Sequence, residues 1–323
     1  MMMLRVAKAF FLLLCFNAAY AQQAYPLRPV RVVVTVQPGG AADLIARIMA
    51  QKLGASFKQV FVVENRAGGG SMAGVLQASR ATADGHTALM VSVNSHGIWP
   101  NTYTKLPFDP IADFAPVGLY ANMPLVMVVN AQLPVKSVAD LIALAQKRPG
   151  GMSFASGGTS SAGHLIGELF KIVTGANIQH IPYKGSGPAA ADLAGGQVQL
   201  AFDALAPQIP YLKSGRTRIL AVTSEKRLSI APDAPTMIEV GYPRVAGSVW
   251  YGLMVPAHTP REVIAGLNAE SNRILATEEV RARLDAVGIE VAGGGTPEDF
   301  GKFIRAEIAK WAPVVKAAGI VPE

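Results

Sequence analysis

The sequence predicts an α/β protein with two doubly wound lobes, and three observations support this fold class. Short apolar strands rich in β-branched residues alternate with amphipathic helices along most of the chain. The 323 residues are about twice the length of a typical domain. Half of the residues are apolar and only 16% are charged, which is typical of sheets that are covered on both faces.

Residues 1–21 have the layout of a secretory signal peptide. Arg5 and Lys8 precede a short apolar run, and Ala19-Tyr20-Ala21 matches the pattern of a cleavage site. The run is too short to span a membrane as a helix. Cys15 is the only cysteine, so we expect an exported, periplasmic chain without disulfides once this segment is removed. An N-terminal core helix and lipidation of Cys15 are the alternatives, and the bulky Leu14 argues against the second.

The first third of the chain predicts three strands and two helices. Strands are expected over 30–36, 60–63 and 87–93, and helices over 41–53 and 71–80. Each of the first two strands ends in a glycine-rich turn that leads directly into a helix. Apolar strands separated by helices predict a parallel sheet with helices on both faces.

The same order of elements recurs in the middle of the chain. Strands are expected over 124–130, 152–155, 178–182, 198–202 and 218–223, with a helix between each of the first four. A last strand over 250–255 precedes two helix starts, one near Thr259 and one at the capping signal Thr296-Pro297-Glu298-Asp299.

This repetition predicts the boundaries between the lobes. We expect the chain to leave the first lobe near Pro124 and to return near Val245. Residues 22–123 and 246–323 would then form lobe 1, and residues 124–245 would form lobe 2. Two lobes joined by two crossings are expected to move as a hinge.

The charge pattern excludes several function classes. The net charge is +7, but the basic residues are dispersed and no aromatic stripe accompanies them, so nucleic acid is not an expected partner. A mildly cationic surface is compatible with small anions. The five histidines are scattered without a metal-binding spacing, so we expect no metal and no cofactor.

Three glycine-rich loops between a strand and a helix are the strongest functional signal. They are Pro38-Gly39-Gly40, Gly68-Gly69-Gly70-Ser71 and Gly157-Gly158-Thr159-Ser160-Ser161. The first N–H groups of a helix have no partner and carry partial positive charge, so a glycine-rich helix start can bind an anion. In a doubly wound sheet such loops converge on one crevice. The alternative is that each loop is only a tight turn and helix cap.

Enzyme signatures are weaker. Gly68, Gly70 and Ala73 form only a loose dinucleotide fingerprint, and the 158–163 segment breaks the spacing of a G-x-S-x-G nucleophile turn. Ser160, His164 and Asp203 could be arranged as a hydrolase triad, so a secreted α/β-hydrolase-like enzyme is an alternative. His164 also fits a structural or pocket role, because it follows Ser160 by four residues on a helix.

Further motifs along the mature chain resemble one family, the extracytoplasmic solute-binding receptors of tripartite tricarboxylate transporters, also called Bug proteins. The matching motifs include Pro38-Gly39-Gly40 with Asp43, Val63-Glu64-Asn65-Arg66, Leu106-Pro107-Phe108-Asp109-Pro110, Ser156 and Gly158 with His164-Leu165, Pro182-Tyr183-Lys184-Gly185, and Trp250-Tyr251-Gly252-Leu253. They occur in the same order as in the family.

The resemblance implies a type II periplasmic-binding fold that closes on a small carboxylate and delivers it to inner-membrane permease subunits, with the receptor as a monomer. It implies that 38–43 and 68–71 bind one ligand carboxylate and that 156–161 and the region of Asp203 lie across the cleft. Thr35-Val36-Gln37 stands where the family usually has Pro-Phe-Ala, so an aromatic side chain is missing there. A receptor-like sensor for a signalling partner is a further alternative. The expected ligand-binding residues are Gly39, Gly40, Asp43, Gly69, Gly70, Ser71, Ser156, Gly158, Thr159, Ser160, Ser161, His164, Tyr183, Lys184 and Asp203.

Overall fold

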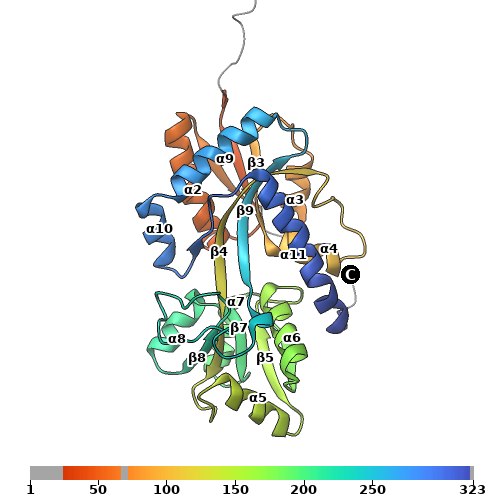
Figure 1. The fold of residues 1–323 in the computed structure, drawn as a ribbon, viewed down its shortest axis with the longest axis vertical. Helices are drawn as coiled ribbons and strands as arrows, with labels where there is room; N and C mark the ends of the chain where they lie inside the picture. Colours follow the sequence, from red (N-terminus) through yellow and green to blue (C-terminus); the bar gives the residue numbers. More distant parts are fainter. Residues whose placement is uncertain (1–24, 67–71, 321–323) are drawn as a thin grey trace, which may run out of the picture.

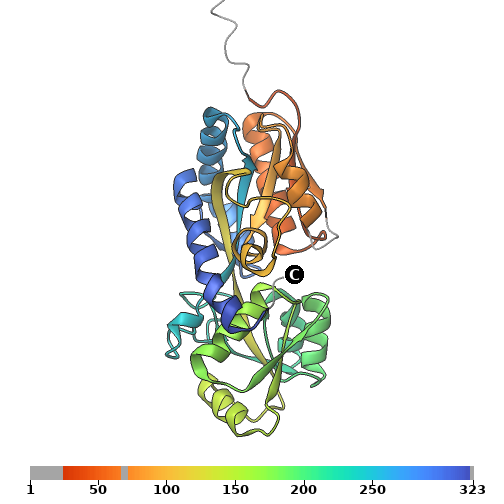
Figure 2. The same ribbon diagram turned by 90° about the vertical axis from the view of Figure 1, so that its right-hand side faces the viewer.

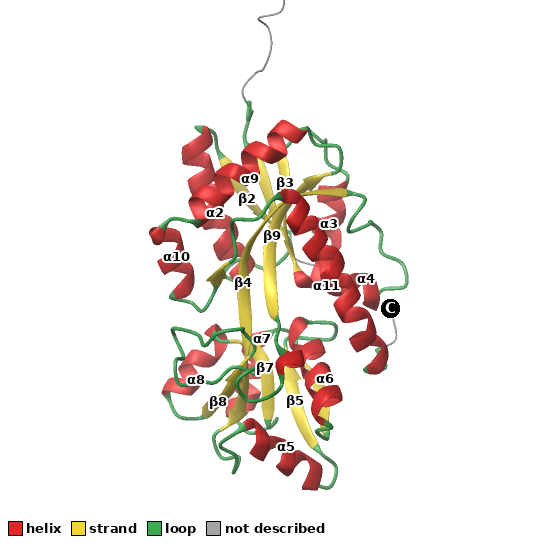
Figure 3. Cartoon of the chain, in the orientation of Figure 1, coloured by secondary structure: helices red, strands yellow, loops and turns green. Residues whose placement is uncertain are grey.

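The computed structural model describes residues 25–66 and 72–320 and shows two α/β lobes arranged along the long axis of the molecule (Figure 1). Helices surround the strands of each lobe, the long strand β4 runs from one lobe into the other, and β9 begins at the junction between them (Figures 2 and 3). The predicted fold class is thereby confirmed. The predicted signal peptide lies outside the described residues.

The centre of the first lobe is a parallel sheet. It contains β1 (Val30–Val34), β2 (Phe61–Asn65) and β3 (Thr87–Ser92), and β1 pairs with both neighbours. Helix α2 (Ala41–Phe57) connects β1 to β2, and α3 (Met72–Ser79) connects β2 to β3. The two connections run in opposite directions across the sheet. Because such connections are right-handed, the two helices cover opposite faces.

The predicted parallel arrangement of the first three strands is confirmed, and antiparallel strands extend this sheet. Strand β9 (Ser248–Pro256) pairs antiparallel with β3 and with β4 (Phe114–Asn130), and the short β10 (Glu290–Val291) pairs antiparallel with β4. The reason is topological: β4 carries the chain out of this lobe and β9 carries it back, so the two strands run in opposite directions.

The remaining helices of this lobe come from two parts of the sequence. After β3 the chain forms a π-helical turn, η2 (Asn94–Ile98), and the short α4 (Trp99–Thr102). After β9 it forms α9 (Arg261–Leu275), α10 (Glu278–Asp285) and α11 (Pro297–Ala317). The predicted capping signal at Thr296 is present: its hydroxyl accepts from the N–H of Asp299 at 3.1 Å.

The second lobe repeats the arrangement of the first. Strands β5 (Met152–Ser156), β6 (Ile178–Pro182) and β7 (Leu200–Ala204) are parallel, and β5 pairs with both others. Helix α6 (Ala162–Thr174) follows β5, and α7 (Ser186–Ala194) follows β6. The lobe is completed by β8 (Thr217–Val222), α5 (Val138–Lys147), α8 (Ile209–Lys213), η3 (Ala206–Gln208) and η4 (Pro243–Val245).

Strand β4 belongs to both lobes. Its residues up to Pro124 pair with β9, and its residues from Leu125 pair with β7 and β8. Thr223, just after β8, fastens this crossing. Its hydroxyl accepts from the Leu125 N–H at 2.9 Å and lies 2.6 Å from the carbonyl oxygen of Gly247, which directly precedes β9. One side chain therefore links the two crossing strands.

Helix α11 also contacts both lobes, because it packs on β4 and reaches α6. Glu307 is buried in this region, and its Oε2 accepts from the indole N–H groups of Trp250 at 3.0 Å and Trp311 at 3.2 Å. Lys310 approaches the other carboxylate oxygen at 3.4 Å. The charge of Glu307 is thus compensated by three donors, as a buried carboxylate requires. No helix in the described ranges has the length and apolar character needed to cross a membrane.

Candidate functional site

The register of the strands places two sets of loops at the junction of the lobes. In the first lobe, Ser92 at the end of β3 pairs with Tyr251, three residues from the Ser248 crossing. In the second lobe, Asp203 near the end of β7 pairs with Val126, two residues beyond Pro124. The carboxyl ends of all six parallel strands therefore point toward the junction, and the loops that follow them face it from both sides.

Within each lobe one loop occupies the topological switch point, the place where successive connections leave in opposite directions. In the first lobe this is the end of β1, and in the second lobe it is the end of β5. Ligands of doubly wound sheets bind at these positions. The structure thus brings two of the three predicted glycine-rich loops, residues 38–40 and 157–161, to the two switch points.

The β1–α2 loop presents an exposed helix start. Residues 36–40 are exposed, and Gly40 caps α2 without any side-chain hydrogen bond. Within residues 25–66 and 72–320, the N-terminal N–H groups of this helix therefore have no capping side chain. Gly39 has a φ of 92°, which favours glycine, whereas Gly40 has an ordinary φ of −81°. A Cβ atom at Gly40 would meet nothing closer than a backbone oxygen at 3.9 Å.

Asp43 holds this loop in place. Its buried carboxylate accepts from the Gly39 N–H at 3.0 Å, from the Arg47 guanidinium at 2.9 Å and from the Asn65 amide at 2.9 Å. Burial alone would raise its pKa, but these hydrogen bonds, that of Arg47 foremost, hold the pKa below its usual value. Asp43 therefore links the loop after β1 to the end of β2.

Sequence reasoning missed a third loop of this lobe. The turn η2 follows β3 at the same edge of the sheet, and it contains Ser95 and the fully buried His96. The Oδ1 atom of Asn94 and the Nε2 atom of His96 are buried without a partner in the described chain. Burial lowers the pKa of His96 to about 3. The order of strands could have indicated this loop. The loop after a third parallel strand must lie at the same edge of the sheet as the loops after the first two.

In the second lobe Ser156 organises the β5–α6 loop. It is fully buried, and its hydroxyl lies 2.7 Å from Nε2 of His180, 3.0 Å from the carbonyl of Gly158 and 3.2 Å from the hydroxyl of Ser161. Ser161 in turn caps α6 by accepting from the His164 N–H at 3.3 Å. Thr159 is exposed at the tip of the loop. Ser156 is therefore a buried residue that stabilises the loop, whereas Thr159 is exposed to solvent.

His164 fixes the strained part of the same loop. Ser160 has a φ of 57°, and its N–H donates to Nδ1 of His164 at 3.2 Å. The ring of His164 stacks on that of His180, with centroids 3.7 Å apart. Burial, together with the nearby Lys171, lowers the pKa of His164 to about 4, and burial beside His164 lowers that of His180 to about 3. Both rings are therefore neutral at physiological pH.

The β6–α7 loop completes this side. Tyr183 donates its hydroxyl to Asp192 at 2.8 Å, and burial and this bond raise its pKa to about 12. Lys184 is exposed, and Gly185 caps α7 without a side-chain hydrogen bond. Lys184 is therefore the accessible cation of this loop, whereas the phenol of Tyr183 is already bonded within the lobe.

Asp203 lies beside this loop and differs from Asp43. Its Oδ1 accepts from Ser186 at 2.6 Å and from the Ala204 N–H at 2.8 Å, but its Oδ2 is buried without a partner in the described chain. Both side-chain polar atoms of the neighbouring Gln208 are likewise buried and unpartnered. Burial therefore raises the pKa of Asp203, although the hydrogen bonds from Ser186 and Ala204 oppose the rise.

These contacts do not form a hydrolase triad. Asp203 bonds to Ser186, and the Nδ1 atom of His164 accepts from the Ser160 backbone. In a hydrolase triad the hydroxyl of the nucleophile is hydrogen-bonded to one imidazole nitrogen, and the carboxylate is hydrogen-bonded to the other. Over residues 25–66 and 72–320, no three histidine, cysteine or acidic side chains gather as metal ligands. The predicted residues Gly69, Gly70 and Ser71 lie outside the described residues.

Known proteins resemble the chain over nearly its whole length. A family model described as tripartite tricarboxylate transporter family receptor matches residues 45–320. The protein BugT of Bordetella pertussis is 37% identical over 94% of this chain and 93% of its own. An R. palustris protein solved with adipate is 37% identical, with a TM-score of 0.83 over 93% of this chain and 100% of the other. MatC from Rhodopseudomonas palustris, with bound malate, is 29% identical, with a TM-score of 0.77 over 90% and 100%.

Proposed function

The chain belongs to the tripartite tricarboxylate transporter receptor family, and on that premise we propose that it captures a small organic acid between its lobes and delivers it to a membrane transporter. Members of this family are periplasmic binding proteins, so the chain is a receptor and not an enzyme. Two similar proteins carry adipate and malate, which supports a carboxylate as the ligand class.

One observation carries the proposal: the helix start after β1 lies at the edge that faces the junction, and no described side chain caps its N-terminus. A carboxylate gains about 1.5–3 kcal/mol from each charge-assisted hydrogen bond, and the dipole of α2 adds about 0.3–2 kcal/mol. Gly40 leaves room for a carboxylate to approach the amides, and the α7 start and Lys184 offer further positive groups on the opposite lobe. We propose that residues 22–123 with 246–323 and residues 124–245 are the two lobes, which the change of strand partners at Pro124 supports.

The test uses a glycine whose Cβ has space. Gly40→Val places a side chain over the helix start without a backbone conflict, so the melting temperature of the unliganded protein should change little. Affinity for the bound acid should fall at least ~10-fold. The matched control is Gly266→Val, because a Cβ there also meets open space but lies on α9, outside these loops. Equal affinity of Gly40→Val and wild type would place the carboxylate elsewhere.

Ligand identity is tested by a thermal-shift screen of the chain without residues 1–21. The screen covers dicarboxylates and hydroxy acids, including adipate and malate, and at least one should raise the melting temperature. Turnover of the bound acid would contradict a receptor.

Delivery is tested by measuring uptake of the labelled acid in cells that lack the receptor and in the same cells after the receptor is restored. Uptake that does not depend on the receptor would contradict a role in transport.

Export is tested by measuring the intact mass of the protein isolated from the periplasm. The mass should correspond to a chain whose N-terminal residue is Gln22.

A further inference from the structure

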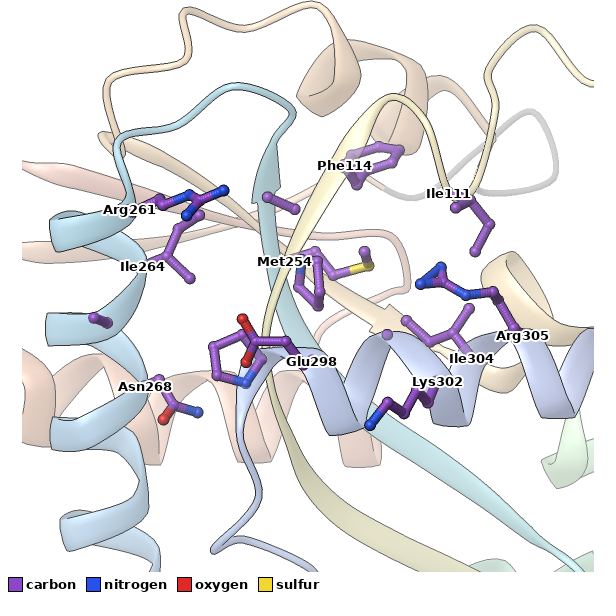
Figure 4. Close-up of a pocket in the computed structure, with 15 residues that line it drawn as sticks. Ile111, Phe114, Met254, Arg261, Ile264, Asn268, Glu298, Lys302, Ile304 and Arg305 are labelled. Atoms are coloured by element: carbon purple, nitrogen blue, oxygen red, sulfur yellow. The ribbon is translucent and has the colours of Figure 1, made fainter.

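A groove on the first lobe lies apart from the loops at the junction. It has a volume of about 680 Å³ and lies between α9 and α11, over the start of β4 and the end of β9 (Figure 4). None of its lining residues belongs to the loops that follow β1, β3, β5, β6 or β7. Its volume falls in the range of small-molecule sites, about 300–1,000 Å³.

The floor of the groove is apolar. Phe114 of β4, Met254 of β9 and Ile304 of α11 form it, and each is at most 4% exposed. Ile264 of α9 lies at the side and is partly buried. In this part of β4, residues 114–120 pair with β9 on one side only, because β10 reaches Ala121 and Asn122. Asn268 of α9, which also lines the groove, donates to the carbonyl oxygen of Val117 on the free side of β4 at 2.7 Å. The groove therefore lies beside an edge of the sheet that α9 covers in part.

The rim of the groove is cationic. Arg261, Lys302 and Arg305 line it, and Glu298 is the one acidic residue among the lining residues (Figure 4). Within the described part of the chain, Arg261 and Arg305 have neither an ion pair nor a hydrogen bond, and Lys302 approaches only Asp299, at 3.8 Å. The positive charge of the rim is thus largely uncompensated by the protein.

The two helices place these cations at electrostatically unfavourable positions. Arg261 is the first residue of the 15-residue α9, where the helix dipole disfavours a cation. Lys302 and Arg305 are three residues apart on α11, where like charges repel. A bound anion would relieve both unfavourable placements. Guanidinium groups are well suited to it, because they bind carboxylates through two parallel hydrogen bonds.

We propose that this groove is a second binding site, for a carboxylate with an apolar body. The apolar part lies over Phe114 and Met254 and against the partly buried Ile264, and the carboxylate pairs with an arginine of the rim. The apolar floor distinguishes this site from the polar loops at the junction. The class of ligand is an alkyl or aryl carboxylate, and octanoate is a suitable probe.

The proposal is tested by titration calorimetry with octanoate on the purified chain. Arg261→Ala/Arg305→Ala should weaken binding at least ~10-fold, and Glu298→Gln should strengthen it, because the repelling charge is removed. Lys147→Ala/Arg148→Ala removes the same charge from exposed positions on the other lobe and should change nothing. Octanol and acetate should each bind more weakly than octanoate, since one lacks the charge and the other the apolar body.

The location is read from the Met254 methyl group. Octanoate should shift its ¹³C-methyl resonance, assigned by its loss in Met254→Leu, while the melting temperature of each unliganded variant confirms folding. The proposal is overturned if octanoate leaves this resonance unchanged, or if the arginine variant and the remote variant behave alike. Absence of octanoate binding up to the limit of its solubility would also overturn it, and would leave the groove as a contact surface for a protein.

Discussion

Two buried aspartates on opposite lobes have opposite pKa shifts. Burial raises the pKa of both, and the difference lies in whether the hydrogen bonds around each carboxylate outweigh it. Asp43 accepts three hydrogen bonds, one of them from an arginine, so its charged form is favoured. Asp203 accepts from neutral groups on one oxygen and has no partner in the described chain for the other, so burial dominates. The charged form is therefore favoured at Asp43 and disfavoured at Asp203, and residue type alone does not distinguish the two.

The raised pKa of Asp203 makes a prediction about stability. Asp203→Asn keeps an oxygen for Ser186 and Ala204 and removes a charge that is costly to bury. The free energy of unfolding at pH 7 should therefore be unchanged or higher. Asp203→Ala leaves both donors unsatisfied and should lower it by about 1–3 kcal/mol. Urea denaturation of the two variants measures the difference, and an equal loss in both would mean that Asp203 is ionised and needs its charge.

The stacked histidines predict loss of stability in acid. A histidine in the unfolded chain has a pKa of about 6.5, whereas burial lowers that of His164 to about 4 and that of His180 to about 3. Between about 6.5 and 4 the unfolded chain binds more protons, so the free energy of unfolding falls as pH falls through this range. His180→Gln should show a smaller fall between pH 7.5 and pH 5. The exposed His258→Asn is the control, and an identical pH profile for both variants would contradict the prediction.

At the scale of elements, α6 is positioned by glycines that admit close packing. A Cβ at Gly163 would lie 2.3 Å from the carbonyl oxygen of Phe202, a backbone atom that cannot turn away. Gly163→Ala should therefore destabilise the protein by about 1–3 kcal/mol. Gly187→Ala on α7 meets open space and should be neutral or stabilising by about 0.4–1 kcal/mol. Thermal unfolding compares them, and tolerance of Gly163→Ala would show that α6 is free to shift.

Helices and strands were predicted well from the sequence where the spacing of apolar residues agrees with a turn or capping motif at the start of the element. The helix after Pro38-Gly39-Gly40 and the one at Thr296 begin where expected, at Ala41 and Pro297. Strand β4 was expected over 124–130 but begins at Phe114. Pro116 and Pro124 concealed its first half, and the structure accommodates Pro116 beside an irregularity in register. Parallel and antiparallel partners could not be separated, because both give apolar runs.

The candidate site was predicted in outline for a topological reason. Glycine-rich loops after parallel strands must meet at one edge, so the loops at 38–40 and 157–161 could be placed at the junction from the sequence. The internal role of Asp43, Ser156 and Tyr183 was not, because an inward and an outward polar side chain look alike in a sequence. The π-helical η2 lacks a glycine-rich signature and was missed. Whether these loops bind the ligand stays a prediction that Gly40→Val tests.

For the whole molecule, two crossing strands fastened near Thr223 predict a hinge. A ligand that contacts both lobes favours the closed arrangement by the contacts it makes only there. The radius of gyration from small-angle scattering should fall when the identified acid is added. Gly40→Val at the same acid concentration should show a smaller fall, because its occupancy is lower. An unchanged radius at saturation in the wild type would mean that the lobes do not move on binding.

The carboxylate of Glu307 has an optical consequence. It is bonded to two of the three tryptophans, one on the crossing strand β9 and one on α11, which extends from the first lobe to α6. Indole emission responds to a hydrogen bond at its nitrogen and to a nearby charge, so a rotation of the lobes that disturbs this arrangement changes the intrinsic fluorescence. The protein therefore carries intrinsic fluorophores beside the strands that cross between the lobes. If the lobes rotate on binding, unlabelled acids are expected to be distinguishable by the emission of the protein itself.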